Sequence, residues 1–263
     1  MYLAARNQVI LRHSLIGAMR MFHRMGYGGM EMSIVRGMTQ ALVLDYMDDY
    51  VINEVNAVSR ELSFPITALA CHQNYATDER VFDAQRKLIS AAKKYGTDIV
   101  IMSTGINVAE RDMHPELYDV LIAKTRALCD TAEEHGVKIA IEVEPNMQIH
   151  NLKIFFDVAE KVKSPALKLN FDVGHIYLSE VDIIKAIDSA KDFIVYSHVE
   201  NMCMGEHCHK LPWEGDIDLK SVYKKLKETC YDGPVSLDIY VQDYETVAPA
   251  CLEYMNKEVF SKI

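Results

Sequence analysis

The sequence lacks several features that would place it in a particular class of protein. No run of apolar residues approaches the roughly 18 that a membrane-spanning helix needs. The six cysteines include no Cys-x-x-Cys pair, so we expect reduced thiols rather than a disulfide framework. The N-terminus has no basic segment followed by an apolar one, so we expect no signal peptide. These absences predict a cytoplasmic protein that does not contact a membrane.

Positive charge is also scarce. The chain has 28 Lys and Arg against 38 Asp and Glu, a formal net charge of -10, and no basic block is longer than two residues. Surfaces that bind nucleic acid carry clustered Lys and Arg, so we do not expect a nucleic-acid partner. There is no Gly-x-Gly-x-x-Gly after the first predicted strand, and no linker or low-complexity tract. A dinucleotide-binding sheet and a second domain are therefore not expected.

Strand and helix patterns alternate along all 263 residues. This length is near the roughly 250 residues of a (β/α)8 barrel, and repeated alternation favours parallel strands with right-handed crossovers. We predict an α/β fold, a single-domain (β/α)8 TIM barrel over residues 1–263, with an open doubly wound sheet as the alternative. The predicted strands are 1–5, 29–33, 66–71, 98–103, 137–143, 166–173, 193–199 and 234–239. The predicted helices are 15–25, 44–62, 80–95, 115–134, 152–162, 181–191, 219–230 and 244–256, with Asp218 as an N-cap.

Four of the predicted strands end in a residue that can bind a metal. They are Lys138-Ile-Ala-Ile-Glu142, Leu167-Lys-Leu-Asn-Phe-Asp172, Phe193-Ile-Val-Tyr-Ser-His198 and Pro234-Val-Ser-Leu-Asp238. A buried charged group needs compensation, and the C-terminal strand ends of a barrel meet at one mouth, where active sites lie. Three carboxylates and one imidazole suit Mn²⁺ best, with Mg²⁺, Co²⁺ or Fe²⁺ as alternatives. Each residue alone could instead be a helix cap or a hydrogen-bonded core residue.

The chain resembles the xylose isomerase-like barrel superfamily of sugar isomerases and epimerases. The resemblance spans essentially the whole chain, and Gly29-Met-Glu31 also fits it. The motifs that carry it are Ala-Ile-Glu142, Phe-Asp172-Val-Gly-His175, His198-Val-Glu200-Asn and Trp213-Glu-Gly-Asp-Ile-Asp218.

The resemblance implies a divalent metal held by Glu142, Asp172, His198 and Asp238, with His175 as a contact either to the substrate or to one of the metal ligands. It also implies proton abstraction next to the carbonyl of a small carbohydrate, where the metal stabilises the developing enolate. The candidate catalytic residues are Glu142, Glu144, His150 and His175. Glu144 follows Glu142 by two residues and should face the same side. His72 and His150 are expected near the mouth of the barrel.

Two departures from the family pattern leave the reaction open. Epimerases of the superfamily usually have Glu rather than Asp at position 238, and often an Arg shortly after the strand that ends in His198. A β-elimination needs only one base, so a lyase like the catalytic subunit of a C-glycoside deglycosidase is an alternative. A non-catalytic sugar-binding barrel is another. An endonuclease-type relative would need more metal ligands and a basic groove. We expect an oligomer, with a small partner subunit as one possibility.

The loop after His198 raises a rival metal site. Cys203, His207, Cys208 and His209 offer four donors within seven residues. Structural zinc sites usually draw on separated pairs of ligands, so this arrangement is unfavourable. A single member such as His207 could reach the active-site cavity instead. Substrate specificity is expected to depend on this loop, residues 200–218, and on residues 105–114.

Overall fold

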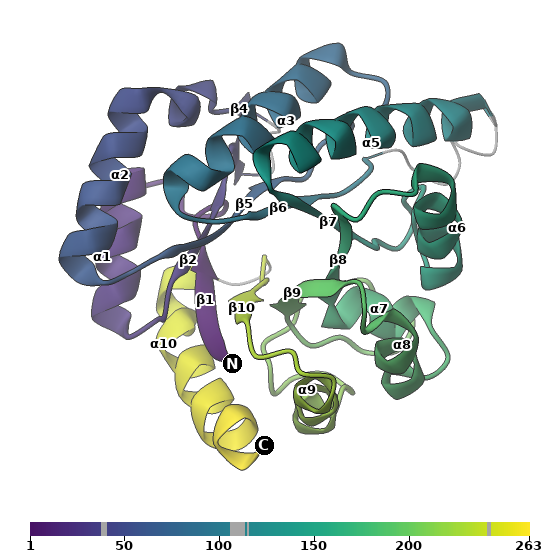
Figure 1. The fold of residues 1–263 in the computed structure, drawn as a ribbon. Coiled ribbons are helices and arrows are strands. Elements are labelled where there is room, and N and C mark those ends of the chain that lie inside the picture. The colour runs from purple at the N-terminus through teal and green to yellow at the C-terminus, as the bar shows by residue number, and fades with distance from the viewer. Residues whose placement is uncertain (38–40, 106–113, 115, 241–242) are drawn as a thin grey trace.

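A computed structural model describes residues 1–37, 41–105, 114, 116–240 and 243–263. Eight parallel strands close into a barrel in the order β1-β10-β9-β8-β7-β6-β5-β2, and helices surround it (Figure 1). This confirms the predicted (β/α)8 barrel and rules out the open sheet. The strands are β1 Tyr2–Arg6, β2 Met30–Ser33, β5 Ile66–Cys71, β6 Ile99–Met102, β7 Lys138–Glu142, β8 Leu167–Asp172, β9 Ile194–Val199 and β10 Pro234–Leu237.

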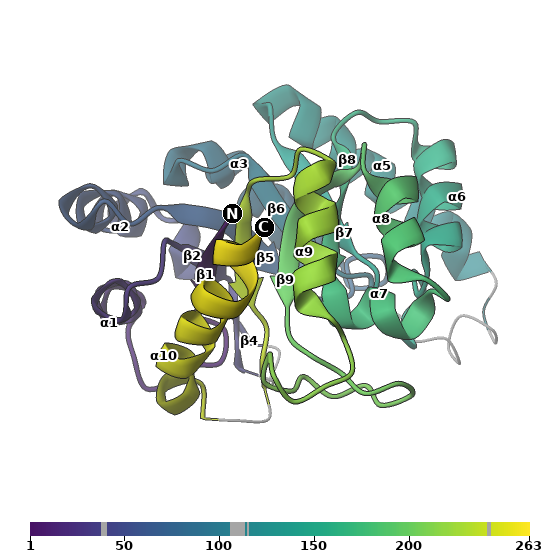
Figure 2. The same cartoon turned by 90° about the horizontal axis from the view of Figure 1, so that it is seen from below.

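The helices pack outside the strands, as the view along a second direction shows (Figure 2). They are α1 Leu15–Met25, α2 Asp49–Leu62, α3 Glu79–Ala92, α5 Glu116–His135, α6 Leu152–Val162, α7 Val173–Ser179, α8 Ile183–Ala190, α9 Leu219–Glu228 and α10 Tyr244–Tyr254. Within the described residues, none of these helices is both long enough and apolar enough to cross a membrane.

Side chains alternate between the two faces of each strand, and this alternation positions the residues of the site. Inside the barrel, Ala68, Ala70, Ile101, Ala140 and Tyr196 form a small apolar cluster. The Tyr196 hydroxyl is hydrogen-bonded to Thr67 (2.6 Å) and to Ser236 (2.7 Å), so this side chain fills the interior of the barrel. Because side chains on one face recur every second residue, the residues that follow by two, such as Glu142 and His198, also face the interior. They lie one layer nearer the C-terminal mouth.

The structure differs from the predicted helices in two places. The predicted helix over 181–191 is the shorter α8, and the unpredicted α7 precedes it directly after β8. The Asp172 carboxylate caps α7 by accepting a hydrogen bond from the His175 amide (2.8 Å). The predicted helix over 44–62 is interrupted at Asp48, whose extended backbone separates a 3-10 turn from α2.

Smaller local features include two predicted ones, at Asp218 and Pro115, and one pair of strands that was not predicted. Asp218 caps α9 by accepting a hydrogen bond from the Ser221 amide, as predicted. A short antiparallel pair, β3 Val35–Arg36 and β4 Ala41–Leu42, was not predicted, because two-residue strands leave no periodic signal. The predicted start of a helix at Pro115 lies outside the described residues.

Candidate active site

The four predicted ligands lie together at the C-terminal mouth of the barrel. Glu142 ends β7, Asp172 ends β8, His198 is the next-to-last residue of β9, and Asp238 directly follows β10. One ligand atom from each lies within 4.8 Å of all the others. All four side chains are buried. Strand register contributes directly, because Asp172 is paired with His198 on the neighbouring strand.

The imidazole of His198 is oriented as in a metal ligand. Its Nε2 lies 2.8 Å from a carboxylate oxygen of Glu31. Its Nδ1 faces the other three ligands, 2.8 Å from Glu142, 3.6 Å from Asp172 and 3.5 Å from Asp238. An N–H at Nε2 donated to Glu31 leaves the Nδ1 lone pair directed at the carboxylates. Carboxylate–histidine pairs of this kind orient ligands in metal sites.

Unsatisfied buried atoms support a cation in this position. Asp172 Oδ2 and His198 Nδ1 are buried and have no hydrogen-bond partner. Glu142 is oriented by the Asn170 amide group, which donates to its Oε2 at 2.7 Å. Buried polar atoms normally find partners, and a hard divalent ion would satisfy both of these at once. The donor set therefore fits a divalent metal.

Arg6 is the main feature of the site that the sequence reasoning missed. It ends β1, is 2% exposed, and forms an ion pair through Nη1 with Asp238. Its Nε lies 3.0 Å from Glu31, and its Nη2 lies 3.0 Å from Gln8 and 3.2 Å from His72. Arginine does not bind metals, so it is not a candidate strand-end ligand, and the first strand was predicted to end at residue 5 rather than at Arg6. A basic residue at a barrel strand end is the signal that could have found it.

Arg6 and Glu31 shape the electrostatics of the fourth ligand. Burial alone would raise the pKa of Asp238, but the Arg6 guanidinium, together with His198 and His209, holds that pKa well below its usual range. Burial likewise opposes ionisation of Glu31, whose pKa is nevertheless lowered to about 2 by Arg6 and then by His198. Both carboxylates are therefore ionised at neutral pH. Asp238 serves two cations, Arg6 and any metal in the site.

A cavity of about 620 Å³ lies at the site, and Glu142 and Asp238 of the quartet line it. Glu144 lines it together with Glu142, as the two-residue alternation predicted. Burial, followed by repulsion from neighbouring carboxylates, raises the pKa of Glu144 to about 7, although His175 opposes this. His72 and His175 also line the cavity. A carboxyl group that is partly protonated near neutral pH beside a cavity is suited to proton transfer.

His150 is placed differently from the other candidates. Its Nδ1 lies 3.2 Å from the carbonyl oxygen of Met147, in the loop between β7 and α6. It is not among the described residues that line the cavity. The predicted position near the mouth therefore does not bring its side chain to the ligands, and its catalytic role stays a prediction.

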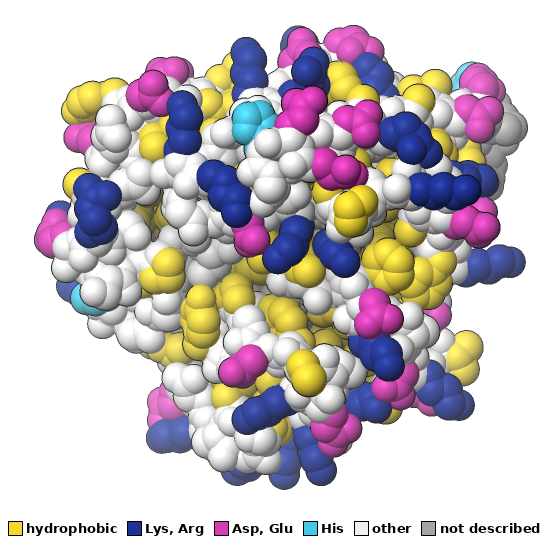
Figure 3. Space-filling view, in the orientation of Figure 1, with side chains coloured by type: hydrophobic (Ala, Val, Ile, Leu, Met, Phe, Trp, Pro, Cys, Tyr) yellow, Lys and Arg dark blue, Asp and Glu magenta, His cyan; other side chains and the backbone are white. Residues whose placement is uncertain are grey.

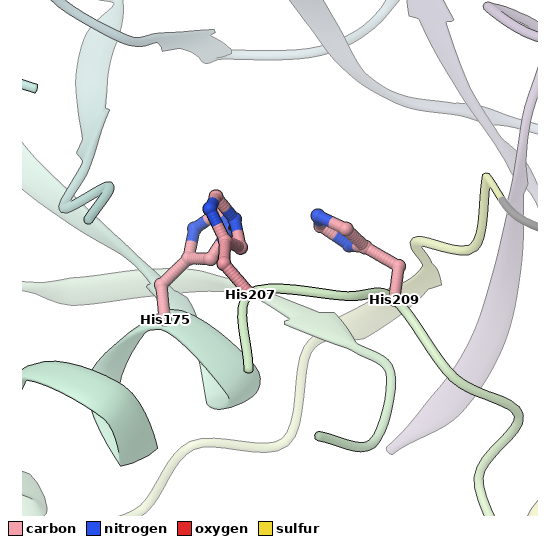
Figure 4. Close-up of side chains that lie close together, drawn as sticks. All are labelled: His175, His207 and His209. Atoms are coloured by element: carbon pink, nitrogen blue, oxygen red, sulfur yellow. The ribbon is translucent and has the colours of Figure 1, made fainter. Parts of the chain in front are cut away.

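The two cysteines and two histidines in the loop after β9 do not lie together as the rival metal site would require. Cys203 Sγ lies 2.9 Å from the Lys210 ammonium, and Cys208 lies 3.9 Å from Glu206. His207 and His209 instead turn towards His175 and line the cavity (Figure 4). Within the described residues the rival site of two cysteines and two histidines is absent, and the expectation that His207 could reach the cavity is confirmed.

The Glu200 side chain contacts the first turn of α7, next to the site. Its Oε1 accepts a hydrogen bond from the Gly174 amide at 2.7 Å, and the side chain is fully buried. Burial and the nearby Asp172 carboxylate raise the pKa of Glu200 well above its usual range. A Cβ on Gly174 would lie 2.0 Å from this oxygen, so only glycine fits.

Gly174→Ala is accordingly expected to destabilise the protein by about 1–3 kcal/mol, because it overpacks the site and breaks a buried hydrogen bond. Urea unfolding would measure the loss. Adding Glu200→Ala should make the cost of Gly174→Ala smaller than in the parent chain, because the clashing oxygen is gone. An unchanged cost in that background would contradict the assigned clash.

The whole chain was compared with known proteins. A model of the xylose isomerase-like TIM barrel family matches residues 20–257. A search of curated protein sequences found no significant match.

Solved structures show the same fold at low identity. The probable 3-DHS dehydratase AsbF of Bacillus anthracis is 17% identical over 98% of this chain and 100% of its own, with a TM-score of 0.82. The IOLI protein with a bound zinc atom is 17% identical over 100% and 99% of the two chains, with a TM-score of 0.81. The 3-keto-D-glucoside 4-epimerase YcjR of E. coli is 15% identical over 97% and 99%, with a TM-score of 0.78. Because the family model covers most of the sequence, this chain belongs to the xylose isomerase-like TIM barrel family.

Proposed function

We propose that the protein is a divalent-metal-dependent enzyme that abstracts a proton next to the carbonyl of a sugar or keto-sugar, as isomerases and epimerases do. The observation that carries the proposal is a buried quartet, two members of which line the cavity: Glu142 and Asp238 line it, and Asp172 and His198 lie beside them. Two relatives of the same fold are by name an epimerase and a dehydratase, and another binds zinc. We propose Mn²⁺ as the ion, with Mg²⁺ or Co²⁺ as alternatives.

The ion would bind sugar oxygens and stabilise the negative charge that develops on the enolate. The protein residues would do the rest. Glu144 and His175 both line the cavity beside the ligands, and either could accept or return the proton. His72, which lies 3.9 Å from Glu142, could hold a substrate hydroxyl. Burial of the ligands would keep bulk water away from the reacting carbon.

Turnover in D₂O would test this proposal. The Mn²⁺-loaded protein would be incubated with a panel of ketoses, aldoses and 3-keto-glycosides, and the products analysed by NMR and mass spectrometry. An isomerase or epimerase should return an isomeric sugar with deuterium on the carbon that lost its proton. Glu142→Gln and chelator-treated protein should give no exchange. Failure of every sugar to exchange deuterium would count against the proposal.

A β-elimination is the second candidate, and Arg6 is the observation that favours it. Asp238 is engaged by the Arg6 guanidinium and has a lowered pKa, so it is poorly suited to be a second base opposite Glu142. An elimination needs only one base. In the same D₂O experiment it would release an aglycone and leave an unsaturated keto-sugar. Binding of a sugar without either reaction would favour the non-catalytic alternative.

The remaining partner predictions concern the molecule as a whole. On the face shown in Figure 3, acidic and basic side chains are interspersed, which supports a small-molecule substrate rather than nucleic acid as the partner. All six cysteines lie in the described residues and are free thiols, which supports the proposed cytoplasmic location. We propose an oligomer, and native mass spectrometry of the purified protein would reveal its copies and any small partner subunit.

A further inference from the structure

One buried side chain at the cavity makes no hydrogen bond within the protein. Gln73 lies two residues beyond the end of β5, is 8% exposed, and lines the cavity beside His72. Its Nε2 is buried and has no hydrogen-bond partner among the described residues. Leaving a buried amide unpaired costs folding free energy, so such groups are normally bonded to protein, water or ligand. The place of Gln73 at the cavity points to a ligand as its partner.

The neighbouring polar side chains in the connection between β5 and α3 are engaged locally. Asn74 Oδ1 accepts hydrogen bonds from the amides of Ala76 and Thr77, both at 3.1 Å, and Asn74 Nδ2 donates to the Thr77 hydroxyl at 2.7 Å. The Asp78 carboxylate caps α3. All of these except Ala76 also line the cavity. Their local bonds leave the Gln73 carboxamide free for a ligand.

The backbone around Gln73 is held on both sides. The Gln73 amide donates to the Cys71 carbonyl oxygen at 3.1 Å, and the same oxygen accepts a hydrogen bond from Gln85 Nε2 at 3.1 Å. Gly105, which follows β6, packs so closely against Asn74 that a Cβ would lie 2.6 Å from the Asn74 nitrogen. A side chain on a fixed backbone loses less entropy when it binds a ligand.

Gln73 lies across the barrel from the metal quartet. Strand β5 is opposite β9, because β8, β7 and β6 lie between them on one side and β10, β1 and β2 on the other. The same cavity is lined by Gln73 and by two members of the quartet, Glu142 and Asp238. A sugar with two oxygens on a metal at the quartet would therefore present a more distant group to Gln73.

The chemistry of a carboxamide matches that of a hydroxyl group. Both can donate and accept a hydrogen bond, and rotation of the amide about its last bond exchanges its donor and acceptor. Phosphates and carboxylates are instead recognised best by the positive charge of Arg or Lys. Gln73 is therefore suited to an uncharged hydroxyl of the substrate.

We propose that Gln73 determines specificity by binding a hydroxyl of an uncharged sugar, remote from the oxygens that bind the metal. This inference rests on the proposed function, because it takes a sugar as the substrate. A site built to hydrogen-bond a hydroxyl discriminates against an analogue that lacks it. The same amide should lower the stability of the sugar-free protein, because it is buried without a partner until the sugar binds.

Calorimetry and thermal unfolding would test the two consequences together. The Mn²⁺-loaded protein would be titrated with neutral ketoses, aldoses and 3-keto-glycosides, and then with monodeoxy analogues of each sugar that binds. Gln73→Leu should weaken binding of the parent sugar about tenfold or more, with Mn²⁺ affinity unchanged. The analogue that lacks the contacted hydroxyl should bind the parent protein and Gln73→Leu equally. The Tm of sugar-free Gln73→Leu should rise, whereas loss of a structural hydrogen bond would lower it.

Gln148 provides a matched control. It is fully buried, both polar atoms of its side chain lack partners among the described residues, and it is not among the described residues that line the cavity. Gln148→Leu should therefore also raise the Tm, while sugar affinity stays at the parent value.

Two results would overturn the inference. Gln73→Leu could bind every sugar as tightly as the parent does, as expected if Gln73 holds only a water molecule, or it could lower the Tm of the sugar-free protein. The proposed function fails on a different result, the absence of deuterium exchange in D₂O. Sugar binding that depends on Gln73 without such exchange would support the inference and count against the proposed reaction.

Discussion

Asp172→Asn should lower divalent-metal affinity at the quartet about 100-fold or more, and turnover about 10³-fold. The substitution removes the negative charge that faces His198 at 3.6 Å but keeps the size of the side chain. Asn is also a good N-cap, so its oxygen can still accept the hydrogen bond from the His175 amide that starts α7. The fold should therefore survive, and the loss should be confined to metal binding and chemistry. Calorimetric titration with Mn²⁺ and the D₂O assay would measure the two effects.

A capping residue elsewhere provides a matched control. Asp182 caps α8 by accepting hydrogen bonds from the amides of Ile184 and Lys185, and it lies away from the cavity. Asp182→Asn makes the same chemical change at the same kind of position, so Mn²⁺ affinity and turnover should stay at the parent values. If Asp172→Asn bound Mn²⁺ as tightly as the parent does, the quartet would not be the metal site.

The barrel and its four strand-end candidate ligands were accessible from sequence because each depends on a local pattern. Apolar runs of strand length mark β7 and β8, and the residue type at each strand end identifies Glu142 and Asp172. Parallel closure then brings such ends together, whatever the details of packing. Glu144 followed from the two-residue alternation beyond Glu142. These inferences needed no knowledge of which side chains touch.

Contacts between distant segments were not accessible in the same way. Arg6 and Asp238 are 232 positions apart, and only the neighbouring positions of β1 and β10 in the closed barrel make them an ion pair. His207 and His209 lie in a loop without periodicity, so no pattern gives the direction of their rings. Helix α7 was missed because its cap, Asp172, was assigned to the metal alone. When a carboxylate is expected to bind a metal, its second role as a helix cap is easily missed in the sequence.

Arg6→Met should destabilise the metal-free protein by about 3–5 kcal/mol, because it leaves buried carboxylates without their partner. The Arg6 guanidinium contacts both Glu31 and Asp238, and all three side chains are at most 3% exposed. A surface pair should behave differently. Arg20 contacts Glu61 at 2.7 Å, but both side chains are well exposed, so Arg20→Met should cost no more than about 1 kcal/mol. Urea unfolding of both variants, with chelator present, would measure the difference.

The loss of stability at acidic pH should also change in Arg6→Met. Arg6 and His198 lower the pKa of Glu31 from 4.5 to about 2 in the folded protein. A lowered folded-state pKa gives stability that is present above pH 4.5 and is lost as the pH falls towards 2. Removing Arg6 raises the folded-state pKa, so the variant should lose less additional stability on acidification below pH 4.5, and its stability should approach that of the parent at low pH.

Added metal should reverse part of the defect. Arg6 competes with a cation for Asp238, so Arg6→Met should bind Mn²⁺ more tightly than the parent does, and saturating ion stabilises the folded state by an amount that grows as Kd falls. Arg6→Lys keeps the charge but loses the two-armed contact. Its stability and its Mn²⁺ affinity should therefore be intermediate between those of the parent and of Arg6→Met. If Mn²⁺ raised the Tm of Arg6→Met by less than it raises that of the parent, Arg6 would be helping to form the metal site rather than competing for its fourth ligand.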